Sequence, residues 1–146
     1  MNGRRSLGIY AGLGWIFVAC LVAQLFLAGL GVFDRATGFA PHREFGYLFG
    51  WLTLGLVVAA LAGRLGRRLT GYGLAMLVLF ALQSLFVALR VDAPFAAALH
   101  PVNGVLILLV AIRASADATR LARAAGAVHP PAVKETSHEP STAQPA

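Results

Sequence analysis

The run LGIYAGLGWIFVACLVAQLFLAGLGVF, residues 7–33, is the clearest indication of the fold of this chain. Only glycines, one tyrosine and one glutamine interrupt its apolar residues. A membrane-spanning helix needs about 20 such residues, whereas the apolar part of a signal peptide has about 7–15. The run is too long for a signal peptide, and Arg4 and Arg5 precede it. We therefore expect an uncleaved helix that crosses a membrane at about residues 8–32.

Three further apolar runs follow, at about residues 45–62, 71–89 and 95–112, and each is close to the length of one membrane crossing. Backbone N–H and C=O groups have no water to bind inside a bilayer, so these runs must be helices. The linkers between them are short, which makes consecutive helices antiparallel neighbours. Residues 1–112 are therefore predicted to form a four-transmembrane-helix bundle, and the chain is an all-α membrane protein.

The composition supports this class and argues against others. Apolar residues make up 58% of the 146 residues, charged residues make up 12%, and the mean hydropathy is +0.74. Soluble domains have about 45–50% apolar and about 25% charged residues. The net charge of +6 comes from basic residues that lie between the apolar runs, so we expect a lipid bilayer as partner and no nucleic acid. The sequence contains no catalytic motif, which leaves open whether the protein is an enzyme.

The basic residues fall unequally on the two sides of the predicted bundle. Nine lie in the N-terminal segment, the middle linker or the C-terminal tail, and three, Arg35, Arg43 and Arg90, lie on the opposite side. Because cytoplasmic segments carry the excess of Lys and Arg, both termini are predicted in the cytoplasm and the protein in the inner (plasma) membrane. Residues 113–128 are expected to form a cytoplasmic helical extension, and the Pro-, Ser- and Thr-rich residues 129–146 a disordered tail.

The chain contains an internal repeat of polar residues. The segments APHREFG, 40–46, and ALHPVNG, 98–104, share the frame Ala-x-His-x-x-x-Gly. Each follows a glutamine in the preceding apolar run, because Gln24 precedes His42 by 18 residues and Gln83 precedes His100 by 17. The repeat predicts two parallel helical hairpins related by an axis along the membrane normal.

The two repeated histidines are the candidate site residues. In a sequential bundle the second and fourth helices are diagonal neighbours, with axes roughly 11–14 Å apart. Two imidazoles that point inward across that distance can ligate one metal macrocycle, which predicts a b-type heme held for electron transfer. Glycines on the same helical faces would leave space for the porphyrin, and arginines near the outer surface would bind its propionates. The predicted cofactor-binding residues are His42, His100, Gly46, Gly104, Arg43 and Arg90, with the two histidines as metal ligands.

A proline follows the second histidine directly. Pro101 has no N–H to donate to the carbonyl of Ala97, four residues earlier. We therefore expect a kink at His100, which would aim its imidazole into the bundle.

Simpler roles remain open for the same residues. His100 can hydrogen-bond Asn103, Gln83 or a carbonyl, and the other histidine can be an interfacial residue. The glutamines can tie helices together, and the Gly46-x-x-x-Gly50 pattern is typical of close helix packing. These features suit a different class of function, a non-catalytic scaffold or accessory subunit that packs against another membrane protein, or a homo-oligomer.

The four-span layout resembles a small bacterial family of membrane proteins of unknown function. The resemblance covers about residues 8–112 and rests on the segments AQLFLAGLGVF, HREFGYLFG and LHPVNG. More distantly, each His-bearing hairpin is similar to those of heme A synthase, whose four-helix halves hold heme through histidines on the second and fourth helices. This similarity implies His42 and His100 as axial ligands. The chain has only one such half, lacks a cysteine pair in the outer loop and has no glutamate shortly before His42, so the similarity implies a heme-holding module and not heme A synthesis.

Overall fold

A computed structural model describes residues 3–34 and 36–127, and this part of the chain consists of helices joined by turns. Four helices in it are long and apolar enough to cross a membrane, which confirms the predicted all-α membrane bundle. The elements are α1 (Gly3–Phe33), α2 (Ala40–Ala62), α3 (Gly66–Ala88), the single turn α4 (Pro94–Ala97) and α5 (Leu99–Ala127). The expected tail at residues 129–146 and the basic residue Arg35 lie outside the described residues.

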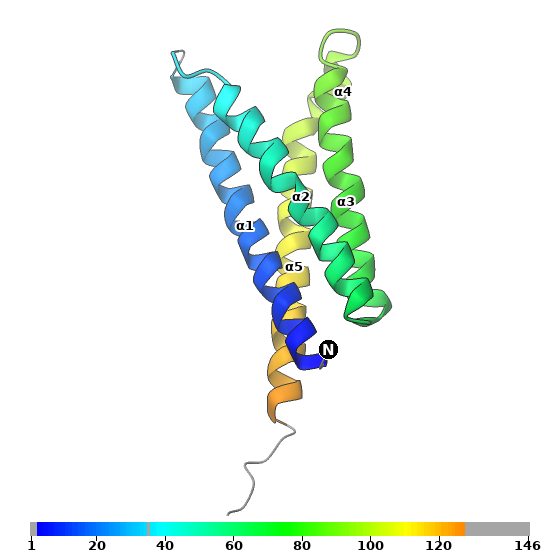
Figure 1. Ribbon diagram of the computed structural model, residues 1–146. Coiled ribbons are helices and arrows are strands. Elements are labelled where there is room, and N and C mark those ends of the chain that lie inside the picture. The colour runs from blue at the N-terminus through cyan, green and yellow to red at the C-terminus, as the bar shows by residue number, and fades with distance from the viewer. Residues whose placement is uncertain (1–2, 35, 128–146) are drawn as a thin grey trace, which may run out of the picture.

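The helices form a closed ring of neighbours. α1 packs against α2 and α5, and α3 packs against the same two helices, so α2 and α5 are diagonal neighbours, as are α1 and α3. The N-terminal end of α1 and the C-terminal end of α5 lie at one end of the bundle, and the pairs α1–α2 and α3–α5 diverge toward the opposite end, which carries α4 (Figure 1). Antiparallel packing through short turns follows from the short linkers that the sequence provides.

Local sequence accounts for the helix boundaries. Pro41 lies in the first turn of α2, where a missing N–H costs nothing. The turn between α2 and α3 has backbone with positive φ at Arg64 and Gly66, a conformation that glycine adopts without strain. Helix α4 ends at Ala97, and Ala98 separates it from α5, two residues before His100. This interruption agrees with the effect expected of Pro101 on the preceding turn.

The hydrophobic core occupies one half of the bundle. We call residues 3–21, 49–62, 66–76 and 107–127 the packed half, since it contains every buried apolar side chain of the described residues. The remaining described residues between 22 and 48 and between 77 and 106 are the histidine half, in which only Asn103 is buried. Small side chains let the helix backbones approach in the packed half, as they do in many membrane bundles.

The packed half extends beyond the span predicted for the last helix. Residues 113–128 were predicted as a cytoplasmic helical extension; α5 continues as a helix to Ala127, and Ala114, Ser115, Asp117 and Ala118 within it are buried. Ser115 lies against Gly14 of α1. The long helices α1 and α5 therefore pack together along the part of α5 that follows its most apolar run.

Candidate functional site

The two predicted site histidines face each other across the diagonal of the bundle. His42 in the first turn of α2 and His100 in the first turn of α5 have ring centroids 6.1 Å apart, with the ring planes inclined by 63°. Both side chains are partly buried. The structure thus brings together two residues that are 58 positions apart in the sequence, on helices whose backbones do not contact each other.

Each histidine is held by the glutamine that precedes it in the repeat. Nδ1 of His42 lies 3.1 Å from the backbone carbonyl of Gln24, and Nδ1 of His100 lies 3.3 Å from that of Gln83. A carbonyl oxygen can only accept, so each Nδ1 must carry the proton and donate it. Each Nε2 is then left with a free lone pair, and no hydrogen bond among the described residues supplies a donor to it.

The two hairpins differ in how they satisfy the glutamine side chain. Asn103 Nδ2 donates to Gln83 Oε1 at 2.6 Å and to the Leu79 carbonyl at 2.8 Å. The corresponding position in the first hairpin is Phe45, which offers no donor. Gln24 Nε2 donates to the His42 carbonyl at 2.7 Å, while its buried Oε1 has no partner. Both hairpins therefore contain the hydrogen bond from the histidine to the glutamine carbonyl, but only the second supplies a donor to the glutamine side-chain oxygen.

The predicted glycines make room for these glutamines. A Cβ added at Gly46 would lie 2.8 Å from Gln24 Nε2, and one added at Gly104 would lie 3.4 Å from Gln83 Nε2. Gly50, which the sequence paired with Gly46 as a helix-packing pattern, faces the ring of Phe80 in the same way. These three glycines therefore allow close packing within the chain, because the space beside them is occupied by glutamine amides and an aromatic ring.

The predicted arginines lie at the same end of the bundle as the histidines and are exposed. Arg43 is 3.9 Å from the carboxylate of Glu44, and Arg90 donates to the carbonyl of Val87 at 3.3 Å. Neither makes a hydrogen bond with a histidine in the described part of the chain. Their guanidinium groups remain accessible to an anion at this end of the bundle.

Sequence reasoning missed a charged cluster in the packed half. The carboxylate of Asp117 is only 6% exposed, and it lies 2.5 Å from Arg68, 3.2 Å from Arg113 and 3.8 Å from Arg120. Tyr72 donates to the same carboxylate at 3.2 Å. Two of the arginines stand four residues before and three residues after the aspartate, which is the spacing of neighbours on one helical face. The spacing of these arginines around Asp117 could have indicated part of the cluster from the sequence. The contact between Asp117 and Arg68 of α3 could be found only from the fold.

The fold and the site define a small four-span integral membrane protein with paired histidines at one end of the bundle. Residues 24–89 match the model of a family of unknown function, DUF6220, which confirms the resemblance to a membrane family without an assigned activity. No curated protein and no solved structure gives a significant match. The similarity to heme A synthase is not shown by any of these comparisons.

The described residues contain no group of three or more His, Cys, Asp or Glu side chains that could hold a metal ion. Metal sites built only from protein side chains generally use three or four ligands. A porphyrin supplies four nitrogen ligands itself, so its iron needs one or two from the protein. The paired histidines offer two ligands, which is fewer than such a protein-only site generally uses.

Proposed function

We propose that the protein holds one b-type heme between α2 and α5, with His42 and His100 as axial ligands, and that this heme transfers electrons in the membrane. The observation that carries the proposal is the facing pair of imidazoles, each oriented by a hydrogen bond from Nδ1 to a glutamine carbonyl. Metal-bound histidines typically donate their second nitrogen to such an acceptor, which fixes the ring and raises the basicity of the ligating nitrogen.

The two imidazoles are close enough for both to hold one metal ion. Their centroids are 6.1 Å apart, and a bond from a metal ion to an imidazole nitrogen is about 2 Å long, so each Nε2 would have to turn toward the ion. The histidine half has no fully buried apolar side chain among its described residues, so a planar group placed there would displace less packing than in the packed half.

The chain's own residues would position the group and limit its chemistry. Exposed Arg43 and Arg90 offer guanidinium groups to propionates at the histidine end. Phe39 places its ring edge to face with His42, with centroids 6.3 Å apart, and restricts that imidazole further. A bound heme would supply iron that cycles between its ferric and ferrous states. If both histidines held the iron, the protein would leave no place on it for a substrate, so the group would serve electron transfer and not catalysis.

The proposal includes an orientation in which both termini are cytoplasmic and the histidines lie near the opposite surface of the inner membrane. It is supported by the nine-to-three distribution of basic residues. Reporters that are active on only one side of a membrane, fused after Gly38, Gly66 and Ala93, would test it. If the reporter fused after Gly66 were active on the outside, the orientation would be the reverse of the one proposed, and the heme proposal would not be affected.

Visible spectra of the full-length protein from heme-replete cells test the heme proposal directly. Wild type should show a low-spin spectrum in the oxidised and reduced states. His42→Ala and His100→Ala should abolish or strongly alter it, while the matched control His129→Ala leaves it unchanged. Circular dichroism of each variant separates loss of heme from loss of fold. A colourless wild type that also takes up no added hemin would contradict the proposal.

An accessory subunit of a larger membrane complex is the second candidate function. A Cβ added at Gly8 or Gly12 of α1 would meet nothing within 4 Å, so this Gly-x-x-x-Gly face is open to another helix. By contrast, Gly46 and Gly50 are engaged inside the chain and cannot form an outward face. The candidate predicts a colourless protein that co-purifies with a second membrane protein after mild extraction and loses it on Gly12→Leu.

A further inference from the structure

The arginines around Asp117 carry more charge than that carboxylate balances. Arg68, Arg113 and Arg120 lie 2.5–3.8 Å from it. No other carboxylate of the described residues lies within 4.0 Å of these three arginines. Three positive groups therefore surround one negative group, and two positive charges have no counter-charge in the part of the chain that the structure describes.

The three guanidinium groups of this Asp117 cluster are close neighbours. Arg68 Nη2 and Arg113 Nε lie 2.5 Å and 3.2 Å from the same oxygen, Asp117 Oδ2, and Arg120 Nη1 lies 3.8 Å from Oδ1. The carboxylate is only 6% exposed, whereas the arginine side chains are 55–72% exposed. Among the described residues, only Arg68 donates a hydrogen bond to Asp117. A guanidinium has five N–H donors, so the cluster can offer several of them to a ligand from outside.

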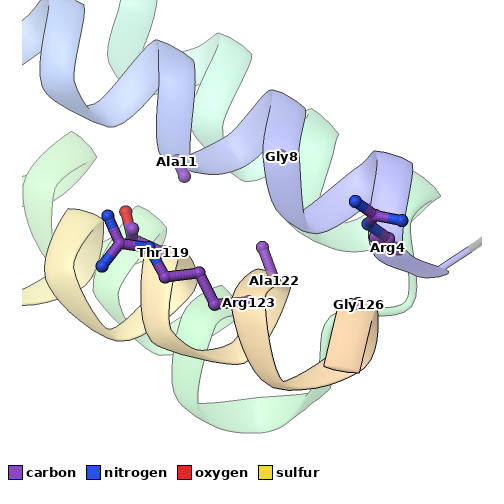
Figure 2. Close-up of a pocket in the computed structure, with 7 residues that line it drawn as sticks. All are labelled: Arg4, Gly8, Ala11, Thr119, Ala122, Arg123 and Gly126. Carbon is purple, nitrogen blue, oxygen red and sulfur yellow. The ribbon is translucent and has the colours of Figure 1, made fainter. Parts of the chain in front are cut away.

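A second pair of arginines at the same end of the bundle is arranged differently. Figure 2 shows a groove between α1 and α5 that has Arg4 at one end and the guanidinium of Arg123 at the other. Ala11 and Ala122 lie between them. This pair adds charge to the same end of the bundle but does not converge on one point, so it serves as a comparison for the Asp117 cluster.

The cluster lies where the apolar runs of two helices end. Arg68 stands shortly before the apolar run 71–89, and Arg113 directly follows the run 95–112. The hydroxyl of Tyr72 donates to the carboxylate of the cluster at 3.2 Å, and tyrosine is enriched where a membrane meets water. These positions place the cluster at the level of lipid headgroups.

An exposed apolar stripe leads from the cluster into the membrane-spanning part of α5. Leu109 and Leu106 stand four and seven residues before Arg113, which places all three on one face of the helix. The two leucine side chains are 59% and 46% exposed. The unbalanced positive charge therefore lies at the end of a surface that can contact an acyl chain.

We propose that the Asp117 cluster binds the headgroup phosphate of an anionic phospholipid, with one acyl chain along Leu109 and Leu106. Arginine suits a phosphate because its guanidinium can donate two parallel hydrogen bonds to the phosphate oxygens. Clusters of basic residues at the end of membrane helices bind such headgroups. The two unbalanced charges favour a lipid of net negative charge over phosphatidylcholine, whose choline cation they repel. The cluster lies toward the end of the bundle opposite to the histidines, so the proposal does not depend on the heme (Figure 1).

Native mass spectrometry of the full-length protein in detergent tests the proposal, by measuring its affinity for dioleoylphosphatidylglycerol and for dioleoylphosphatidylcholine. Wild type should bind the anionic lipid more tightly. R113Q/R120Q should lower the affinity for it by about 20-fold, at roughly fivefold for each arginine. This variant keeps Arg68, which donates the hydrogen bond to Asp117, so the buried carboxylate retains a partner.

The matched control is R4Q/R123Q, which removes the same charge from the same end of the bundle and should keep most of the lipid preference. The single variant R120Q should lose about fivefold in affinity for the anionic lipid. Because Arg120 is 72% exposed and lies 3.8 Å from Asp117, its loss disturbs the fold least, and R120Q gives the answer if the double variant does not fold. Circular dichroism of each variant measures its helix content.

Three results would overturn the proposal. The first is equal affinity of wild type for the two lipids. The second is an equal loss of preference in R113Q/R120Q and R4Q/R123Q, which would show a general attraction between charges. The third is displacement of phosphatidylglycerol by an equal concentration of inorganic phosphate, which would make the cluster a site for a free anion. A loss of preference in R113Q/R120Q or R120Q, with helix content unchanged and the control unaffected, would support the proposal.

Discussion

The packed half and the histidine half of this bundle are held together in different ways. In the packed half, apolar side chains such as Phe17, Leu56 and Ile107 are fully enclosed, and Tyr10 reaches across the diagonal to donate to the Leu69 carbonyl at 2.9 Å. In the histidine half, hydrogen bonds join α1 to α2 and α3 to α5, beside partly buried apolar side chains such as Phe45 and Phe80.

This difference indicates in which half the helix contacts can rearrange more easily. Within lipid there is no hydrophobic driving force between helices, so close packing is the main source of stability in the packed half. Each hydrogen bond in the histidine half contributes about 0.6 kcal/mol on average, so this half, with fewer buried side chains, can rearrange at lower cost. Under the heme proposal, the histidine half would admit the cofactor and the packed half would hold its ligands in place.

The largest loss of stability is expected when a side chain is added to a glycine in the packed half. A side chain at buried Gly14 would collide with Ser115 of α5, whereas one at Gly12 would meet nothing within 4 Å. Gly14→Leu should therefore lower the free energy of unfolding by about 1–3 kcal/mol, and Gly12→Leu should leave it nearly unchanged. Thermal melting in detergent measures both. Equal melting temperatures would show that α1 and α5 do not pack as tightly as described.

A smaller effect is expected from the polar contacts of the histidine half. Asn103→Leu removes the donor to Gln83 Oε1 and to the Leu79 carbonyl and should cost about 1 kcal/mol. Gln24→Leu removes one hydrogen bond together with an oxygen that already lacks a partner, so its cost should be lower. Melting of the two variants beside wild type measures the difference. A Gln24→Leu cost above that of Asn103→Leu would mean that the two hairpins are bonded more alike than the structure shows.

The smallest effect concerns the linker at the histidine end. Hydrogen bonds from Thr37 and from the Ala36 N–H lower the pKa of Asp34 below its usual value of 3.8. Because the folded pKa is lowered, the bonds stabilise the linker above the ordinary pKa of aspartate, and this contribution is lost as the pH falls through the folded value. Wild type and Asp34→Asn should differ slightly in melting temperature at neutral pH and converge in acid. A difference that grows in acid would contradict the direction of the shift.

The membrane-spanning helices and the repeat could be predicted from the amino-acid sequence alone. The length of the apolar runs and the need to satisfy backbone groups in lipid are properties of single segments, so no tertiary contact is required to read them. The shared His-x-x-x-Gly frame also placed His42 and His100 at equivalent positions of two hairpins before any distance was known. The diagonal relation of α2 and α5 followed from short linkers and is observed in the fold.

The contacts between particular side chains depend on the tertiary structure. There, Gly46 and Gly104 face the glutamine amides, most of residues 114–118 are buried, and Arg68, Arg113 and Arg120 surround Asp117. Each of these contacts depends on the rotation of a helix about its axis and on its axial offset from its neighbour. Packing of small and large side chains between helices sets both quantities, and the pattern along one helix does not contain them.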